Sequence, residues 1–204
     1  MRRLLRVLGW LVLLVCALSV VARLLLLELA EVGHDDMAPT LRQGERLVVY
    51  TRATLERGDV VVCQHPTEPG RPIVGRLMGL PGDVLEMSRG QLSINGVPVG
   101  TTPGEPAETT VGSGDGARAL RVVRETLSSG RTYLTAVDPA ARLALRPVTV
   151  GTGYYLLSDE RTRGSDSRRF GEVDPSRCLG RALWVLLPAD RSDGTSRGVL
   201  SPIE

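Results

Sequence analysis

The feature that most constrains this chain is an apolar run near its N-terminus. Residues 1–6 carry three arginines, residues 7–22 contain no charged side chain, and the apolar run continues past Arg23 to residue 27. As a helix, residues 4–27 would rise about 36 Å, enough to cross a hydrocarbon core of about 30 Å if the Arg23 side chain reaches the interface. We therefore expect a transmembrane anchor over residues 1–30. Because the arginines precede the run, we expect a single-pass protein of the cytoplasmic membrane, with its N-terminus in the cytoplasm and its body on the outer face.

Two other interpretations of the run are open. A cleaved secretory signal would fit the small residues Val20 and Ala22, with a cut after Ala22. A lipoprotein signal would use Cys16, but Val15 is larger than the residue that such sites need before the cysteine. We favour a retained anchor over both, and the sequence leaves its cleavage open.

The body, residues 31–188, has the composition of short strands joined by turns. The chain holds 23 glycines and 13 prolines, and aromatic residues make up only 3%, which favours an all-β fold. The runs that predict strands are residues 46–50, 59–63, 73–74, 84–87, 91–94, 97–99, 131–137, 154–157 and 182–187. The Asn95-Gly96 pair predicts a tight hairpin turn. Residues 101–116 predict a polar loop, and residues 189–204 a flexible tail.

Charge and cysteine content exclude several kinds of function. The formal charge of +2 comes from scattered residues, so we expect no nucleic-acid partner. All basic residues are arginine, and without lysine no mechanism that needs a neutral amine side chain is available. Cys63 and Cys178 lie in the predicted exported body, where they could pair; we favour two buried thiols. With two histidines and no CxxC pair, we expect no metal and no cofactor.

Several ordered sequence boxes give the chain a resemblance to a known family. They are residues 34–41 (HDDMAPTL), 57–63 (RGDVVVC), 75–83 (GRLMGLPGD), 91–96 (QLSING), 158–171 (SDERTRGSDSRRFG) and 180–182 (GRA). In order and spacing they resemble type I signal peptidases, over about residues 32–188. The resemblance implies an antiparallel β domain behind one transmembrane helix, and a serine/lysine dyad that cleaves signal peptides.

The residues that the family uses for catalysis are replaced here. On the family's pattern Asp36 holds the position of the nucleophilic serine, Gly75 that of the lysine base, and Gly164 that of the serine that orients the lysine. A hydroxyl needs a neighbouring base to become a nucleophile, and a glycine supplies none. The adjacent Arg76 stays protonated and cannot act as that base. We therefore expect no catalytic residues and an inactive protein.

Other pairs of polar residues could in principle carry chemistry. Asp35 and Asp36 could form an aspartic-protease pair, but neighbours in an extended segment point to opposite faces. His34 and Asp36 share a face and could make an acid/base or metal pair; we favour a solvated polar cluster. Cys63 and His65 lie two apart on a predicted strand, and we interpret them as structural.

The resemblance also implies a peptide-binding groove, which does not depend on the replaced catalytic residues. Met37, Pro39, Ile73 and Val74 would flank it, and Asp166, Ser167 and Arg168 match the family's supporting polar residues. The favoured hypothesis is a single-pass pseudopeptidase that binds signal-peptide-like segments or preproteins, or partners an active signal peptidase. The alternatives are an active signal peptidase with an atypical site and a structural envelope protein.

Overall fold

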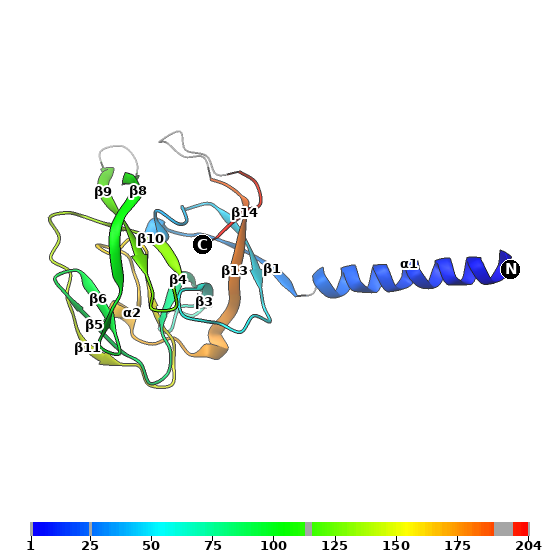
Figure 1. Cartoon of the computed structure of the whole chain (residues 1–204), viewed down its shortest axis with the longest axis horizontal. Coiled ribbons are helices and arrows are strands. Elements are labelled where there is room, and N and C mark those ends of the chain that lie inside the picture. The colour runs from blue at the N-terminus through cyan, green and yellow to red at the C-terminus, as the bar shows by residue number, and fades with distance from the viewer. Residues whose placement is uncertain (1, 25, 113–115, 190–197, 204) are drawn as a thin grey trace.

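The computed structural model of the chain describes residues 2–24, 26–112, 116–189 and 198–203. Helix α1 (Arg2–Leu24) comes first and a body of strands follows (Figure 1). The strands are β1 (Leu27–Glu31), β2 (Arg46–Tyr50), β3 (Val60–Gln64), β4 (Pro72–Gly79), β5 (Val84–Ser88), β6 (Gln91–Ile94), β7 (Val97–Pro98), β8 (Gly100–Val111), β9 (Arg118–Thr126), β10 (Thr132–Val137), β11 (Leu145–Thr149), β12 (Tyr155–Leu157), β13 (Cys178–Leu187) and β14 (Ser201–Pro202). Short helical turns are η1 (Asp35–Met37), α2 (Ser167–Phe170) and η3 (Pro175–Arg177).

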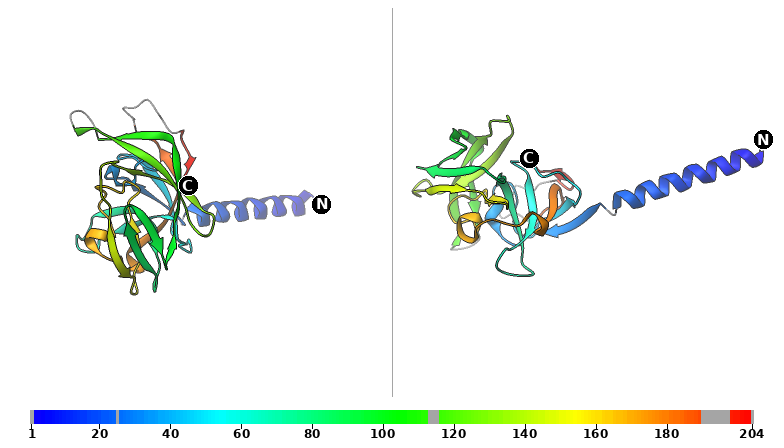
Figure 2. Two further views of the ribbon diagram at one scale, coloured as in Figure 1. Left: turned by 60° about the vertical axis from the view of Figure 1, so that its left-hand side comes forward. Right: turned by 90° about the horizontal axis from the view of Figure 1, so that it is seen from below.

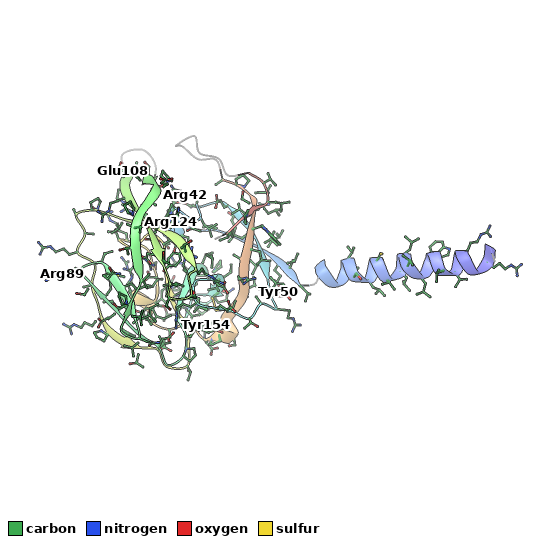
Figure 3. The ribbon with its side chains drawn as sticks, in the orientation of Figure 1. Arg42, Tyr50, Arg89, Glu108, Arg124 and Tyr154 are labelled. Atoms are coloured by element: carbon green, nitrogen blue, oxygen red, sulfur yellow. A yellow bond between two sulfur atoms is a disulfide. The ribbon has the colours of Figure 1, made fainter. Side chains whose placement is uncertain are left out.

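Helix α1 stands apart from the strands in every view (Figures 1 and 2). Its apolar side chains radiate into open space (Figure 3), with Trp10 74% exposed. Within the described residues, no helix is both long and apolar enough to cross a membrane, so the predicted transmembrane helix is not found. The uncharged run of residues 7–22 rises only about 24 Å as a helix, less than a hydrocarbon core of about 30 Å.

The predicted anchor over residues 1–30 also extends too far. Residues 27–31 form β1, which pairs antiparallel with β2 from Leu27 opposite Tyr50 to Glu31 opposite Arg46. Three of its five side chains, Glu28, Leu29 and Glu31, are exposed, which is in line with its place at the edge of a sheet. The β body therefore begins at β1.

The strands of the described chain form three antiparallel sheets. The first has the order β1-β2-β13-β3-β4-β12, with β14 also on β13. The second has the order β10-β9-β8 and the third the order β11-β5-β6-β7. The predicted antiparallel all-β body is thus confirmed.

The polar segment 101–116, predicted as a loop, is mostly strand. Its residues to Val111 belong to β8, which pairs with β9 through two stretches separated by a register shift between Pro103 and Glu108. The irregularity lets prolines sit in a strand without breaking the rest of the ladder. Of the predicted loop, residues 113–115 lie outside the described residues.

The predicted flexible tail is partly ordered. Ser201 and Pro202 pair with Val185 and Trp184 of β13, and Ile203 packs on an apolar cluster of the first sheet. Pairing with an edge of β13 fixes this end of the chain. Residues 190–197 and 204 of the predicted tail lie outside the described residues.

Cys63 and Cys178 form a disulfide, so the favoured interpretation of two thiols is wrong. The two residues lie directly opposite each other in the antiparallel ladder of β3 and β13. This register brings their side chains to the same face at bonding distance, which sequence spacing alone does not specify.

Candidate functional site

The turn η1 holds Asp36 in a fixed position beside the first sheet. Met37 is buried in an apolar cluster that includes Val60 and Val62 of β3. The Glu160 N–H donates to the Asp36 carbonyl at 2.9 Å. The backbone at residue 36 is therefore fixed both by packing and by a hydrogen bond from the segment that follows β12.

The Asp36 carboxyl is half-buried in a polar setting that disfavours its charge. Burial raises its pKa above the ordinary value, although the backbone N–H of Ser165 and the charge of His34 act to lower it. The carboxylates of Glu160 and Asp166 raise it further. This position thus holds a carboxyl group with no hydroxyl nucleophile.

Gly75 leaves no side chain at the position where the family resemblance expects a base. It lies in β4, opposite Val61 of β3, and its backbone is outside the left-handed region. A Cβ built there would lie 3.1 Å from the Leu156 Cβ, so even a small side chain would press on β12. The adjacent Arg76 offers no replacement.

Arg76 is fully buried and engaged on every side. Its Nε and Nη2 donate to the two carboxylate oxygens of Asp159 at 2.9 and 2.7 Å, and its Nη1 donates to the Gly58 carbonyl at 2.8 Å. The guanidinium also lies 4.3 Å from the ring centre of Tyr133. A guanidinium held this way joins β4 to the segment after β12 and takes no part in proton transfer.

Gly164 occupies a turn that is too tight for any side chain. A Cβ built there would approach the Glu160 carbonyl oxygen and the Ser158 hydroxyl oxygen to 2.5 Å each. The Ser158 hydroxyl is buried and has no hydrogen-bond partner among the described residues. It therefore fills the space that a serine side chain at residue 164 would need.

A hydrogen-bonded cluster at the start of α2 consists of Asp166, Ser167 and Arg168. The Asp166 carboxylate caps the helix by accepting from the Arg168 N–H and also accepts from the Ser158 N–H at 2.9 Å. The Ser167 hydroxyl accepts from the Leu156 N–H at 2.9 Å. These contacts tie α2 to β12.

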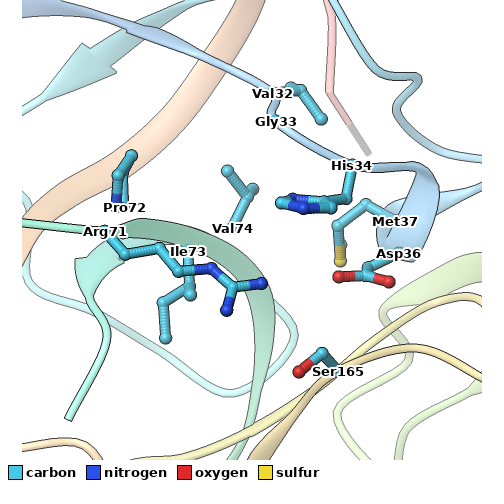
Figure 4. A pocket seen from close by; sticks show the side chains of 10 residues that line it. All are labelled: Val32, Gly33, His34, Asp36, Met37, Arg71, Pro72, Ile73, Val74 and Ser165. Carbon is cyan, nitrogen blue, oxygen red and sulfur yellow. The ribbon is translucent and has the colours of Figure 1, made fainter. Parts of the chain in front are cut away.

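A small pocket lies between η1 and the first half of β4 (Figure 4). Its volume is about 20 Å³, room for about one water-sized group. Figure 4 shows the Asp36 carboxylate facing the side of the pocket where Ser165 lies, while Arg71 and Val74 lie across from His34. The residues that line it are Val32, Gly33, His34, Asp36, Met37, Arg71, Pro72, Ile73, Val74 and Ser165.

The structure brings together three of the four predicted groove residues. Met37, Ile73 and Val74 line the pocket, whereas Pro39 does not belong to its lining. His34 and Asp36, predicted as a solvated cluster, also line it. Arg71 and Ser165 also line the pocket and were not predicted, although Ser165 directly follows Gly164 in the sequence box 158–171.

The edge of β4 beside the pocket is unpaired within the described chain. Residues 72–76 pair with β3 on one side, but β12 pairs only with Arg76, Leu77 and Gly79 on the other. Residues 72–75 therefore have no strand partner on that side among the described residues. An extended peptide could add there as a further strand.

The fold and this site define an antiparallel β protein with a small pocket beside an open strand edge. The sequence profile described as "Signal peptidase, peptidase S26" matches residues 4–187. The chain belongs to this signal peptidase family.

Two curated relatives agree with this assignment by sequence. A signal peptidase I of Bacillus licheniformis is 32% identical over 177 residues, covering 84% of this chain and 82% of the relative. A signal peptidase I of Bacillus amyloliquefaciens is 30% identical over 186 residues, covering 88% and 84%. The crystal structure of a signal peptidase I from Enterococcus faecalis is 24% identical and covers 63% of this chain and 97% of that one, with a TM-score of 0.38.

Proposed function

We propose that this protein is a non-catalytic signal peptidase homologue that binds extended, signal-peptide-like segments of preproteins. The observation that carries the proposal is the combination of an open β4 edge and pocket with a missing base. Residues 72–75 have an unpaired edge within the described chain, and Gly75 supplies no side chain. Main-chain pairing along a strand edge needs backbone and shape and no nucleophile.

The absence of lysine from the sequence supports the loss of dyad chemistry. The base cannot come from another lysine, and Arg76 is held in a buried ion pair with Asp159. Asp36 offers a carboxyl where a base-activated hydroxyl would be needed. The residues at positions 36, 75 and 164 therefore all support the loss of the catalytic dyad.

The pocket's dimensions support a preference for small side chains. At about 20 Å³ it has room for about one water-sized group, which favours a short side chain, and Val32, Ile73 and Val74 give it apolar walls. A peptide strand on β4 would direct alternate side chains toward this pocket. We infer a ligand with alanine or glycine at the position that enters it.

We also propose that helix α1 attaches the protein to the cytoplasmic membrane, with the β body on the outer face. Support comes from its exposed apolar side chains, among them Val7, Leu8 and Trp10. The arginines at its N-terminal end favour a cytoplasmic location for that end. Membrane-bound preproteins, or an active signal peptidase acting on them, would then be the partners.

A second candidate is an active peptidase with an atypical site. It is favoured by the convergence of His34, Asp36 and Ser165 on one pocket, since a histidine, a carboxyl and a hydroxyl are the groups of hydrolytic sites. The relatives named above carry the name signal peptidase I. The third candidate, a structural envelope protein, would bind no peptide in the pocket.

Peptide binding separates the first candidate from the third. A fluorescent peptide with a signal-peptide C-terminal region is titrated with the full chain in detergent, and Ser165→Leu is used to fill the pocket. We expect saturable binding that Ser165→Leu weakens at least tenfold. The matched control Ser128→Leu lies in the exposed turn between β9 and β10 and should bind as the parent does. Equal binding by both variants, or none by the parent, would refute the proposal.

A further inference from the structure

A second cavity, of about 210 Å³, lies on one face of the β8–β9–β10 sheet. Arg121, Val123 and Glu125 alternate along β9 and so share that face. Thr135 and Val137 of β10 lie opposite Val123 and Arg121 and line the same cavity. At about 30 Å³ per water, the volume equals that of roughly seven waters. The pocket beside η1 shares no lining residue with it.

A buried ion pair forms part of the cavity wall. The Arg161 side chain is 3% exposed, and its Nη2 donates to Glu125 Oε2 at 2.8 Å. The Tyr133 hydroxyl donates to the same oxygen at 2.8 Å, and the Thr135 hydroxyl donates to Glu125 Oε1 at 3.3 Å. The Glu125 carboxylate is therefore well satisfied.

The Arg161 guanidinium is not satisfied. Its Nε and Nη1 are buried and have no hydrogen-bond partner among the described residues. Burial acts to lower the pKa of Arg161, but the charges of Glu125, Tyr133 and Asp159 and the hydrogen bond to Glu125 together raise it, so the group stays charged. An unpaired buried donor costs about 1–3 kcal/mol, and more when it is charged. The cavity is thus lined by a cation of which two nitrogens lack acceptors among the described residues.

The remaining charges favour an anion. Arg89 and Arg121 are exposed at the rim, with Arg89 at the outer end of the β5–β6 hairpin (Figure 3). Asp138 is the other acidic lining residue besides Glu125. Three arginines against two carboxylates leave one positive charge, which matches a singly charged ligand better than a doubly charged phosphate. Carboxylates also match the planar guanidinium geometry.

We propose that this cavity binds a carboxylate group, with Arg161 as its main donor and Arg121 and Arg89 at its rim. The carboxylate belongs either to a small organic acid or to the C-terminus of a peptide. Since Nε and Nη1 are shielded from solvent, binding includes a rotation of the Arg161 side chain toward the cavity.

The test uses the full chain in detergent at a fixed ionic strength, because rim charges respond to salt. The probes are sodium propionate, an N-acetylated trialanine with a free C-terminus, the same peptide as its amide, and sodium phosphate. Binding is followed by the Tm and by the ¹⁵N resonance of Arg161 Nε. The double variant Glu125→Gln/Arg161→Gln assigns that resonance and removes both charges of the pair together.

We expect a saturable shift of the resonance and a saturable rise of the Tm with propionate, with the free-acid peptide or with both. The probe that gives these changes identifies the source of the carboxylate. The amide should do neither, and the double variant should lose binding. Arg121→Ala, at an exposed position, should weaken binding about two- to fivefold. Arg52→Ala, exposed after β2, is the control and should change nothing. The proposal would be overturned if neither acid gave a saturable shift, if the amide bound equally well, or if phosphate bound more tightly. If the double variant does not fold, the binding measured with Arg121→Ala decides.

Discussion

Placing a serine at residue 164 should destabilise the protein instead of restoring an orienting hydroxyl. A Cβ there would lie 2.5 Å from the Glu160 carbonyl oxygen and from the Ser158 hydroxyl, about 1 Å inside ordinary contact. Overpacking of this kind costs about 1–3 kcal/mol of unfolding free energy. Because one of the crowded atoms belongs to the backbone and cannot move aside easily, we expect about 3 kcal/mol for Gly164→Ser. For a chain of this size that lowers the Tm by about 6–12 °C.

The assay is urea unfolding followed by circular dichroism. Gly33→Ser is the matched control, because nothing lies within 4 Å of a Cβ built on Gly33. Ser158→Gly removes one of the two clashes, so the double variant Ser158→Gly/Gly164→Ser should recover about 1 kcal/mol relative to additivity. The reasoning fails if Gly164→Ser unfolds at the same urea concentration as the parent, or if the two changes are additive.

Three further predictions follow from individual contacts. The disulfide between Cys63 and Cys178 has a sequence separation of 115, so its loss in the Cys63→Ser/Cys178→Ser variant should lower the unfolding free energy by about 4.8 kcal/mol; equal urea midpoints would contradict this. Burial raises the pKa of Asp36, so the contribution of its protonated form to the stability of the fold is present below about pH 4 and is lost as the pH rises. Asp36→Asn should therefore be more stable than the parent at pH 7. The difference between their Tm values should shrink toward about pH 4 when both are melted in parallel. Asp159→Asn should cost about 3–5 kcal/mol in urea unfolding because it removes the carboxylate that the buried Arg76 guanidinium contacts through two nitrogens, whereas a loss below 1 kcal/mol would show this ion pair to be dispensable.

The strands with clear local signals could be predicted from the sequence. Residues 46–50 and 91–94 form strands with the expected bounds, because β-branched or alternating residues end at glycine or Asn-Gly turns. Strand β8 could not be predicted, since its Pro, Gly and Thr content indicates a loop and only pairing with β9 makes it a strand. The disulfide escaped prediction because it depends on the register of β3 against β13.

The site was only partly predictable. The resemblance placed Met37, Ile73 and Val74 along one groove, and all three line the pocket. The conflict between Ser158 and a side chain at residue 164 depends on the shape of a turn, which no local pattern encodes. The two Arg161 nitrogens without a partner in the described part of the chain likewise follow from packing between distant segments.

The most direct test of the central claim is a cleavage assay with the full chain. The purified protein in detergent is incubated with a preprotein bearing a signal peptide, and products are followed by mass spectrometry, with an active signal peptidase as the positive control. We predict binding of the preprotein without cleavage above background, since removal of such a catalytic unit costs about 10⁶-fold in rate. Multiple turnovers at the signal-peptide junction that disappear in His34→Ala or Asp36→Asn would contradict the account and show that the pocket is an active site.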